Sequence, residues 1–364
     1  MNLSLTAEQR LLAQSARAFL TRVCPISQVR TLASGAAGFD AVVWKEMAAL
    51  GWLDATHRTF VEATLLLEEM GRVLLPSPFL VSAVLAAGLL RTLADDAQRQ
   101  RWLAPMEAGD LVATLALAEP GWRDEWEEPR LAAHVDGEGL HLTGVKTFVP
   151  FAQQAQLLLV WAGAGGGDML LVAIDSGAPD LEYARLATLG GDPAYEVKVS
   201  NLCVPLANVV GKPGAARAAI ARTLSYAAVG SLAHAVGAAD RVLEMTVEHA
   251  RTRVQFGRPI GSFQAVAHRC TDMRSDIDAL RYLVYQAAWC LDAGRSADLE
   301  VSAAKAYGNE ALRRIFMHAH QVHGAIGFST EHDLHLFARR AKATELTWGS
   351  TGLHLERVAR AMGL

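Results

Sequence analysis

The sequence predicts an α+β protein with an N-terminal α-helical domain, a middle β-barrel or sandwich domain and a C-terminal four-helix bundle. Both ends of the chain carry long segments of helical apolar spacing with few breakers, whereas the middle carries short alternating segments between glycine-rich turns. A length of 364 residues also suits about two or three packed units. We place the domains at residues 1–112, 113–212 and 213–364.

The first domain is expected to be helical throughout. Thr6 and Gln9 have the spacing of a capping box, and apolar residues follow at helical spacing. Further helices are predicted over residues 60–73, 79–93 and 95–103. Strand-like alternation is absent from this part of the sequence.

The middle domain has the pattern of short strands. Residues 140–149 and 195–200 alternate between apolar and polar types. The apolar runs 156–161 and 169–174 are separated by the glycine-rich segment 163–168. These features favour a barrel or sandwich inserted between the helical parts.

The last domain is expected to consist of long helices. They are predicted over residues 215–252, 264–293 and 297–320, and a last one ends near Met362. Helices of this length with few breakers are typical of a four-helix bundle.

Composition excludes several classes of protein. The net charge is −4 without any basic block, which gives no indication of nucleic-acid binding. The four cysteines are scattered and follow no zinc-site spacing, as expected for thiols in a reducing compartment. Residues 73–90 are uncharged, but Pro76 and Pro78 leave an apolar helix too short to span a membrane. No secretory signal is visible, so we expect a cytoplasmic protein that does not enter the membrane.

The joint between the first two long C-terminal helices is a candidate ligand site. Residues 251–264 contain three arginines beside two phenylalanines and two glutamines, with two glycines and a proline to break the helix. Guanidinium groups suit phosphate oxygens, and an aromatic ring suits a flat group such as adenine. The alternative is a helix C-terminus whose solvated arginines offset the helix dipole.

A second candidate is the segment 321–331, where a helix runs into a glycine-rich turn. Such a turn lets a ligand approach the backbone closely, although it is equally compatible with a plain loop between helices. Five nearby histidines do not match any metal-site spacing, so no metal site is expected: His318, His320, His323, His332 and His335.

Together these segments resemble the acyl-CoA dehydrogenase family. The resemblance covers the whole chain, and its motifs are Arg253-x-x-Phe256-Gly257 followed by Gly261-x-Phe263-Gln264, Gln321-x-x-Gly324 followed by Gly327-Phe328, Gly71 to Pro78, and Ala118-Glu119-Pro120.

The resemblance implies an FAD-containing oxidoreductase of fatty acid and lipid catabolism that acts on the CH–CH bond of an acyl-CoA thioester. A carboxylate base takes the α-proton and the flavin accepts the β-hydrogen as hydride. Members of the family are dimers or dimers of dimers, because FAD lies across a subunit interface. An electron-transfer flavoprotein is the implied electron acceptor.

By the same resemblance, one end of the cofactor site is retained. The implied cofactor-binding residues, which reach the diphosphate and adenine of an FAD held mainly by the opposite subunit, are Arg253, Phe256, Gln264, Gln321, Gly324 and Ala325. Ala325 stands where a second glycine is usual.

The other end departs from the family pattern. The family pattern of Thr-Glu-Pro followed by Gly-Ser-Asp reads Ala118-Glu119-Pro120-Gly121-Trp122-Arg123-Asp124 here, so the Thr and Ser hydroxyls are lost. The flavin-side strand reads Phe148-Val149-Pro150, and proline offers neither an N–H nor a hydroxyl.

The catalytic residue is unknown. The two usual base positions hold Ala227 and Trp348, and residues 213–238 contain no Asp or Glu. Glu345 is the nearest carboxylate to the second position, and its simpler interpretation is a surface ion pair with neighbouring basic residues.

Three hypotheses follow. The first is the smaller subunit of a heteromeric acyl-CoA dehydrogenase, whose larger homologous subunit supplies the base. The second is a homomeric dehydrogenase, a dimer or tetramer, with an atypical base. The third is a flavin-free member of the family that serves as an interaction scaffold. We favour the first, because random decay would not spare the retained residues while removing the base and both flavin-side donors.

Overall fold

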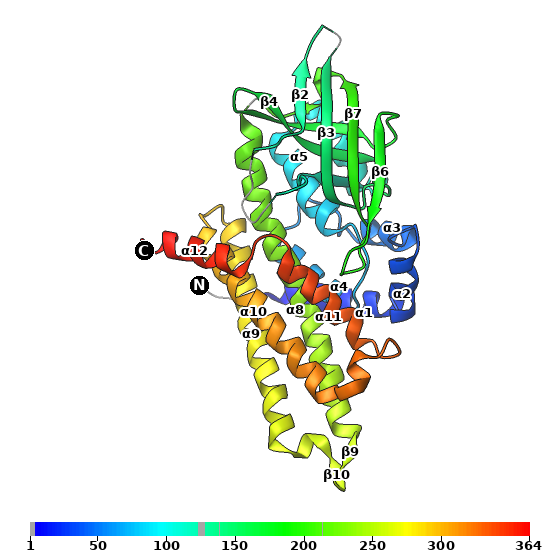
Figure 1. Cartoon of the computed structure of the whole chain (residues 1–364), viewed down its shortest axis with the longest axis vertical. Helices are drawn as coiled ribbons and strands as arrows, with labels where there is room; N and C mark the ends of the chain where they lie inside the picture. Colours follow the sequence, from blue (N-terminus) through cyan, green and yellow to red (C-terminus); the bar gives the residue numbers. More distant parts are fainter. Residues whose placement is uncertain (1–3, 123–127, 138, 213) are drawn as a thin grey trace. The chain divides into compact units, whose positions relative to one another are not determined.

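The computed structural model describes residues 4–122, 128–137, 139–212 and 214–364 (Figure 1). The chain forms two compact units that are discontinuous in sequence. Unit 1 comprises residues 1–30, 60–75 and 228–364, and unit 2 comprises residues 31–59 and 76–227. The three-domain division expected from the order of elements stays a prediction.

Unit 1 is helical, and the helices α2 (Ile26–Ser34) and α8 (Ala215–Thr252) continue from one unit into the other. Its remaining helices are α1 (Ala7–Val23), α4 (Phe60–Arg72), α9 (Gln264–Asp292), α10 (Asp298–His323), α11 (Leu334–Leu346) and α12 (Thr351–Ala361). Thr6 and Gln9 form the expected capping box at the start of α1.

Small residues let the helices of unit 1 pack closely. A Cβ atom on Gly308 of α10 would lie 2.7 Å from a methyl carbon of Leu232 in α8 and 3.0 Å from one of Leu280 in α9. Helix α4 crosses α8 at similarly short range, through Gly71 and Gly237. The close packing of these helices therefore depends on glycine at the crossings as well as on the apolar side chains that fill the core.

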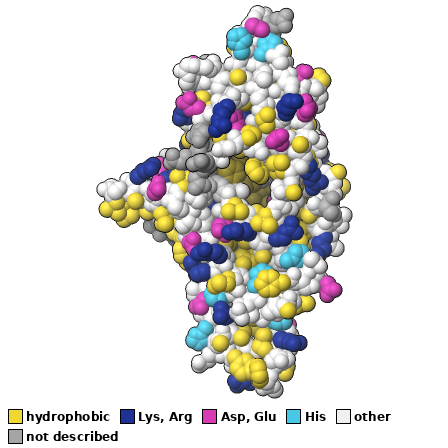
Figure 2. Space-filling model, viewed as in Figure 1, with side chains coloured by type: hydrophobic (Ala, Val, Ile, Leu, Met, Phe, Trp, Pro, Cys, Tyr) yellow, Lys and Arg dark blue, Asp and Glu magenta, His cyan; other side chains and the backbone are white. Residues whose placement is uncertain are grey.

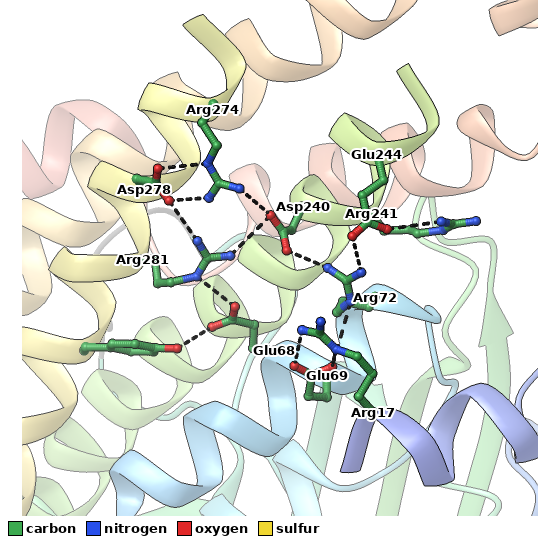
Figure 3. Close-up of polar contacts among 11 residues, drawn as sticks. Arg17, Glu68, Glu69, Arg72, Asp240, Arg241, Glu244, Arg274, Asp278 and Arg281 are labelled. Carbon is green, nitrogen blue, oxygen red and sulfur yellow. Dashed lines mark hydrogen bonds and ion pairs between the residues drawn. The ribbon is translucent and has the colours of Figure 1, made fainter. Parts of the chain in front are cut away.

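A network of ion pairs links α1, α4, α8 and α9 within unit 1 (Figure 3). Asp240 lies at its centre, 2.5 Å from Arg72 and 2.9 Å from Arg274. Glu68 accepts from Arg281 at 2.8 Å and from the Tyr285 hydroxyl at 2.8 Å. Burial raises the pKa of Glu68, an effect that Arg281 partly offsets, so this carboxylate needs its guanidinium partner.

Unit 2 is built around a sheet that contains eight strands in the described part of the chain. The strands are β1 (Ala113–Ala116), β2 (Ala132–Val135), β3 (Leu140–Pro150), β4 (Leu157–Gly165), β5 (Asp168–Asp175), β6 (Leu181–Leu186), β7 (Ala194–Val204) and β8 (Val209–Val210). Their order is β6-β7-β3-β2-β4-β5-β8, and β1 pairs with β4. Figure 1 shows β2, β3, β7 and β6 side by side.

The helical part of unit 2 precedes the sheet in sequence. It contains α3 (Ala41–Ala49), the π-helices η1 (Leu80–Ala86) and η2 (Arg99–Leu103), and the short α-helices α5 (Ala87–Leu93), α6 (Asp96–Gln98) and α7 (Ala104–Glu107). The Ser82 hydroxyl of η1 accepts from the Ala113 N–H at the start of β1, at 3.0 Å. This bond ties the helical segment directly to the sheet.

The predicted α+β order of helices, sheet and helices is confirmed, with differences in detail. The single helix expected to end near Met362 is two helices, because Trp348 and Gly349 both adopt positive φ and separate α11 from α12. Strands β2 and β6 did not appear in the sequence pattern. No helix among the described residues is both long and apolar enough to cross a bilayer.

Candidate functional site

The joint between α8 and α9 is a tight hairpin. Strand β9 (Val254–Gln255) pairs with β10 (Arg258–Pro259), and the two residues between them have positive φ, 54° for Phe256 and 78° for Gly257. Two such residues in succession match a type I′ turn, in which glycine is favoured. The Phe256 side chain is 91% exposed. The turn therefore presents an aromatic ring at the surface.

The predicted Arg253 and Gln264 flank this hairpin. Both are exposed, and the Arg253 carbonyl accepts from the Ile260 N–H at 2.9 Å as the chain returns. A Cβ on Gly261 would lie 3.0 Å from the Ala250 carbonyl oxygen. Glycine at this position leaves room for the returning chain beside α8, and Arg253 and Gln264 lie on either side of it in the sequence.

The second predicted segment also ends a helix. Helix α10 stops at Gly324, whose φ is +65°, and the chain continues as the 3₁₀-helix η5 (Gly324–Phe328). Gln321, Gly324 and Ala325 are exposed. Phe328 is 73% exposed, and its ring stacks on His320 at 4.5 Å. The backbone here is open to a ligand.

The structure brings the two segments together through a contact that the sequence did not reveal. His249, one helical turn before Arg253, stacks on His323, two residues after Gln321, with ring centroids 4.7 Å apart. The residues of each motif are thereby held at the same end of unit 1. No sequence pattern identified His249, because a single histidine near a helix end has many simpler roles.

Hydrophobic side chains gather at this end of the molecule. Figure 2 shows them at the lower end of the face, over β9 and β10 of Figure 1. Val254 is 53% exposed and Ile326 41% exposed, in addition to the two phenylalanines. Exposed apolar side chains gathered in one place are typical of an interaction site.

The two positions at which a base is usual hold apolar residues. Ala227 lies fully buried in α8. Trp348 precedes Gly349 in the α11–α12 loop, whose carbonyl groups are held by His354 Nε2 at 2.9 Å and by Asn309 Nδ2 at 3.3 Å. The loop is therefore anchored on both sides, yet it carries no carboxylate at this position.

Glu345 is engaged elsewhere. Its carboxylate pairs with Lys342, three residues earlier on α11, at 2.7 Å. This is the local ion pair that the sequence suggested as the simpler interpretation. Glu345 stays the weak candidate for a base.

In unit 2, a buried ion pair holds the loop that begins at Ala118. Lys146 of β3 is fully buried and lies 2.6 Å from Glu119, which also accepts the backbone N–H groups of Arg130 and Leu131. Burial lowers the pKa of Lys146 to about 8, against the opposing effect of Glu119. The loop is fixed by its glutamate, whereas the side chain of Ala118 takes no part.

The neighbouring end of β3 has an unusual backbone. Phe148 has φ +50° and is 65% exposed, within a break in register between Lys146 and Val149. Pro150 accepts a hydrogen bond from Thr114 through its carbonyl oxygen but has no donor to offer. Arg123 and Asp124, which end the segment that begins at Ala118, lie outside the described residues.

The described residues contain no group of three or more His, Cys, Asp or Glu side chains placed to hold a metal ion. A cavity of about 380 Å³ is lined by Arg17, Arg72 and Arg241. These arginines already pair with Glu69, Asp240 and Glu244.

Family models match both helical regions of the chain. Residues 6–110 match the acyl-CoA dehydrogenase N-terminal domain, and residues 214–363 match the acyl-CoA dehydrogenase C-terminal domain. The acyl-CoA dehydrogenase FadE27 of Mycobacterium tuberculosis is 32% identical over 93% of each chain.

Solved structures agree along the whole length. A chain of the ChsE4-ChsE5 complex from Mycobacterium tuberculosis is 30% identical with a TM-score of 0.89, covering 100% of this chain and 99% of that one. A chain of a variant of the Tcur3481-Tcur3483 steroid ACAD is 28% identical with a TM-score of 0.87, covering 98% of each. Butyryl-CoA dehydrogenase from Megasphaera elsdenii, 23% identical with a TM-score of 0.91 over 100% of each chain, shares the fold. The chain therefore belongs to the acyl-CoA dehydrogenase family.

Proposed function

We propose that this protein is the smaller subunit of a heteromeric acyl-CoA dehydrogenase. It completes the FAD site of a larger homologous subunit and leaves the catalytic base to that partner. One asymmetry carries the proposal: the segments around Arg253 and Gln321 are kept and exposed, whereas both base positions are apolar.

The residues at the lower end of unit 1 fit the adenosine diphosphate part of FAD. The exposed Arg253 suits a phosphate, Phe256 offers a flat ring, and Gly324 at φ +65° permits close approach to the backbone. Bound there, FAD supplies the two-electron acceptor for α,β-dehydrogenation of an acyl-CoA thioester. The role of these residues is to hold the cofactor, not to move a proton.

The residues expected beside the flavin ring do not offer the usual donors. Ala118 and Pro150 lack hydroxyl groups, and Pro150 also lacks an N–H. Stabilising the charge that develops on a thioester carbonyl requires such donors placed in advance. A partner that carries both the donors and the base removes this difficulty.

The relatives support an assembly of two different chains. The ChsE4-ChsE5 and Tcur3481-Tcur3483 structures each name two proteins, and the second names a steroid. A bulky acyl-CoA is accordingly the substrate class we propose, in a cytoplasmic complex with an electron-transfer flavoprotein as the electron acceptor. The exposed Phe256 and Phe328 support a surface that is covered in the assembly.

Co-expression tests this proposal. The chain alone should bind FAD weakly and should not oxidise acyl-CoA, whereas its complex with a larger homologue encoded nearby should hold one FAD for each pair. Robust turnover by the isolated chain would instead establish the homomeric dehydrogenase with an atypical base. A complex without flavin absorption would establish the scaffold.

A residue-level test uses two arginines of the same joint. Arg253→Ala should lower FAD retention by the complex about tenfold or more, since a charge-assisted bond to phosphate is lost. Arg251→Ala is the matched control, because Arg251 is exposed two residues earlier and lies outside the motif. Equal retention by both variants would show that the contact is misassigned.

A further inference from the structure

Three imidazole rings are in contact at the lower end of unit 1, two of them stacked and the third edge-on, and we call this group the stack. The His249 ring of α8 lies parallel to that of His323 in α10, with centroids 4.7 Å apart and planes 23° apart. The ring of His332, in the segment before α11, meets the His323 ring edge-on, with centroids 4.9 Å apart. The stack thus joins three elements that are distant in sequence.

The surroundings of the central ring, His323, favour its neutral form. His323 is 5% exposed, and its Nδ1 donates to the Ala319 carbonyl oxygen at 2.8 Å. Its Nε2 is buried and has no hydrogen-bond partner among the described residues. His332 Nδ1 accepts from the Leu334 N–H at 3.2 Å. A proton on His323 Nε2 would therefore be buried without an acceptor.

The charged groups that face the stack are mostly cations or potential cations. They are His249 and Arg253 from α8, His320 from α10, and His332 from the segment before α11. Two neighbouring charged groups already have partners: Arg269 of α9 donates to His318, and Asp333 pairs with Arg30 of α2. Burial, then the neighbouring histidines, lowers the pKa of His323 to about 4. Burial also lowers the pKa of His249 and of His320.

We propose that this stack is a positioning element for the dinucleotide tail: while uncharged, it holds the Arg253 end of α8 against the Gln321–Gly324 end of α10. The inference rests on the proposed function, because it assigns those two ends to one cofactor. His249 lies one helical turn before Arg253, and His323 directly precedes Gly324. Separation of the rings would part the two halves of the site.

The sign of the pH effect follows from the lowered pKa. In the unfolded chain His323 titrates near 6.5, and in the folded chain at about 4. The folded state therefore loses stability as the pH falls from 6.5 towards 4, because protonation is easier in the open or unfolded form. Adjacent imidazolium ions would also repel each other.

The role of the stack is tested first on the chain without FAD, by measuring hydrogen exchange of the backbone amides of residues 320–332. Exchange in the natural chain should rise about tenfold between about pH 7.5 and about pH 5.5, after correction for the intrinsic rate. His323→Phe keeps a ring in the stack without a titratable group at this position, so its exchange should change less with pH than that of the natural chain. His323→Ala removes the ring and should exchange fast at both values. His134→Gln, in the exposed part of β2, is the matched control.

FAD retention by the co-expressed complex is the second measurement. At about pH 7.5, His323→Ala should lower the FAD affinity of the complex about tenfold, because the two helix ends are no longer held together, whereas His323→Phe should lower it less than about threefold. If exchange of the natural chain is independent of pH, if His323→Phe exchanges as the natural chain does, or if His323→Ala retains FAD as the natural complex does, the inference is wrong. If the complex holds no FAD even at about pH 7.5, the proposed function fails. The exchange experiment then still decides whether the stack holds the ends of α8 and α10 together.

Discussion

Gly71 of α4 and His234 of α8 lie backbone to backbone. A Cβ atom on Gly71 would stand 1.8 Å from the His234 carbonyl oxygen, and one on Gly237 would stand 1.7 Å from the Glu68 carbonyl oxygen. The two helices therefore touch through their main chains on both sides of the crossing. Gly71 opens one of the motifs by which the sequence resembles its family, and its role in this structure is packing.

Replacing either glycine should be strongly destabilising. Gly71→Ala or Gly237→Ala forces α4 and α8 apart, at a cost of about 3 kcal/mol or more in the free energy of unfolding. Gly88→Ala, in α5, is the matched control, since a Cβ there meets no atom within 4 Å and alanine favours a helix. Urea denaturation measures all three variants. A loss as small for Gly71→Ala as for Gly88→Ala would contradict the close crossing.

The Glu68–Arg281 pair gives a second prediction. Arg281→Met leaves a buried carboxylate without its guanidinium and should cost about 3–5 kcal/mol of stability. Adding Glu68→Gln should restore part of the loss, because the uncompensated charge is then removed. Arg313→Met, at an exposed arginine paired with Glu310, should cost less than about 1 kcal/mol. Chemical denaturation of the single and double variants provides the comparison, and a double variant no more stable than Arg281→Met would argue against this account.

Lys305 should make the stability of unit 1 depend on pH. It is fully buried, and its Nζ donates to Asn309 Oδ1 at 2.5 Å and to the Thr344 carbonyl oxygen at 2.9 Å. Burial lowers its pKa from 10.5 to about 7. Because the folded pKa is the lower one, the contribution of Lys305 to stability is complete above 10.5 and is lost as the pH falls through 7.

The measurement is the difference in unfolding free energy between the natural chain and Lys305→Met. This difference should grow by about 2–3 kcal/mol in favour of the natural chain between about pH 7 and about pH 9. Lys45→Met, at an exposed lysine, shows whether the loss of a positive charge alone gives such a slope. A difference that does not vary with pH would mean that Lys305 stays charged in the folded chain.

A carboxylate placed at residue 348, where the family resemblance implies a base, should not by itself give the isolated chain dehydrogenase activity. Trp348→Glu places an acid before Gly349, but Ala118 and Pro150 still lack the donors that stabilise the developing charge. We expect no reduction of an artificial electron acceptor when acyl-CoA is added to the isolated variant. Turnover by this single variant would show that the site lacks only its base, and circular dichroism confirms that the variant is folded.

Long periodic segments made much of the fold predictable. The bounds of α8 agree with the predicted helix 215–252, because few breakers interrupt its apolar spacing. Strands β2 and β6 were missed because they are short and mostly exposed, so their stability comes from their partners in the sheet and not from their own pattern. The bend at Trp348 was missed because positive φ is rare for a residue of this size.

The same distinction applies to the candidate site. Arg253, Phe256 and Gly324 could be proposed from the sequence because they stand in linear motifs. The contact between His249 and His323 depends on how α8 and α10 pack, and no local pattern encodes it. The pairing of Glu345 with Lys342 was foreseen, since residues three apart on a helix are neighbours.

The Lys146–Glu119 pair has a consequence for how such a protein can evolve. The pair fixes the loop after β1 through a glutamate, a lysine and two backbone amides, none of which belongs to residue 118. The atoms that hold the loop in place are therefore different from the side-chain atoms of residue 118. The side chain at position 118 can therefore change while the loop keeps its shape, because the contacts that hold the loop do not involve that side chain.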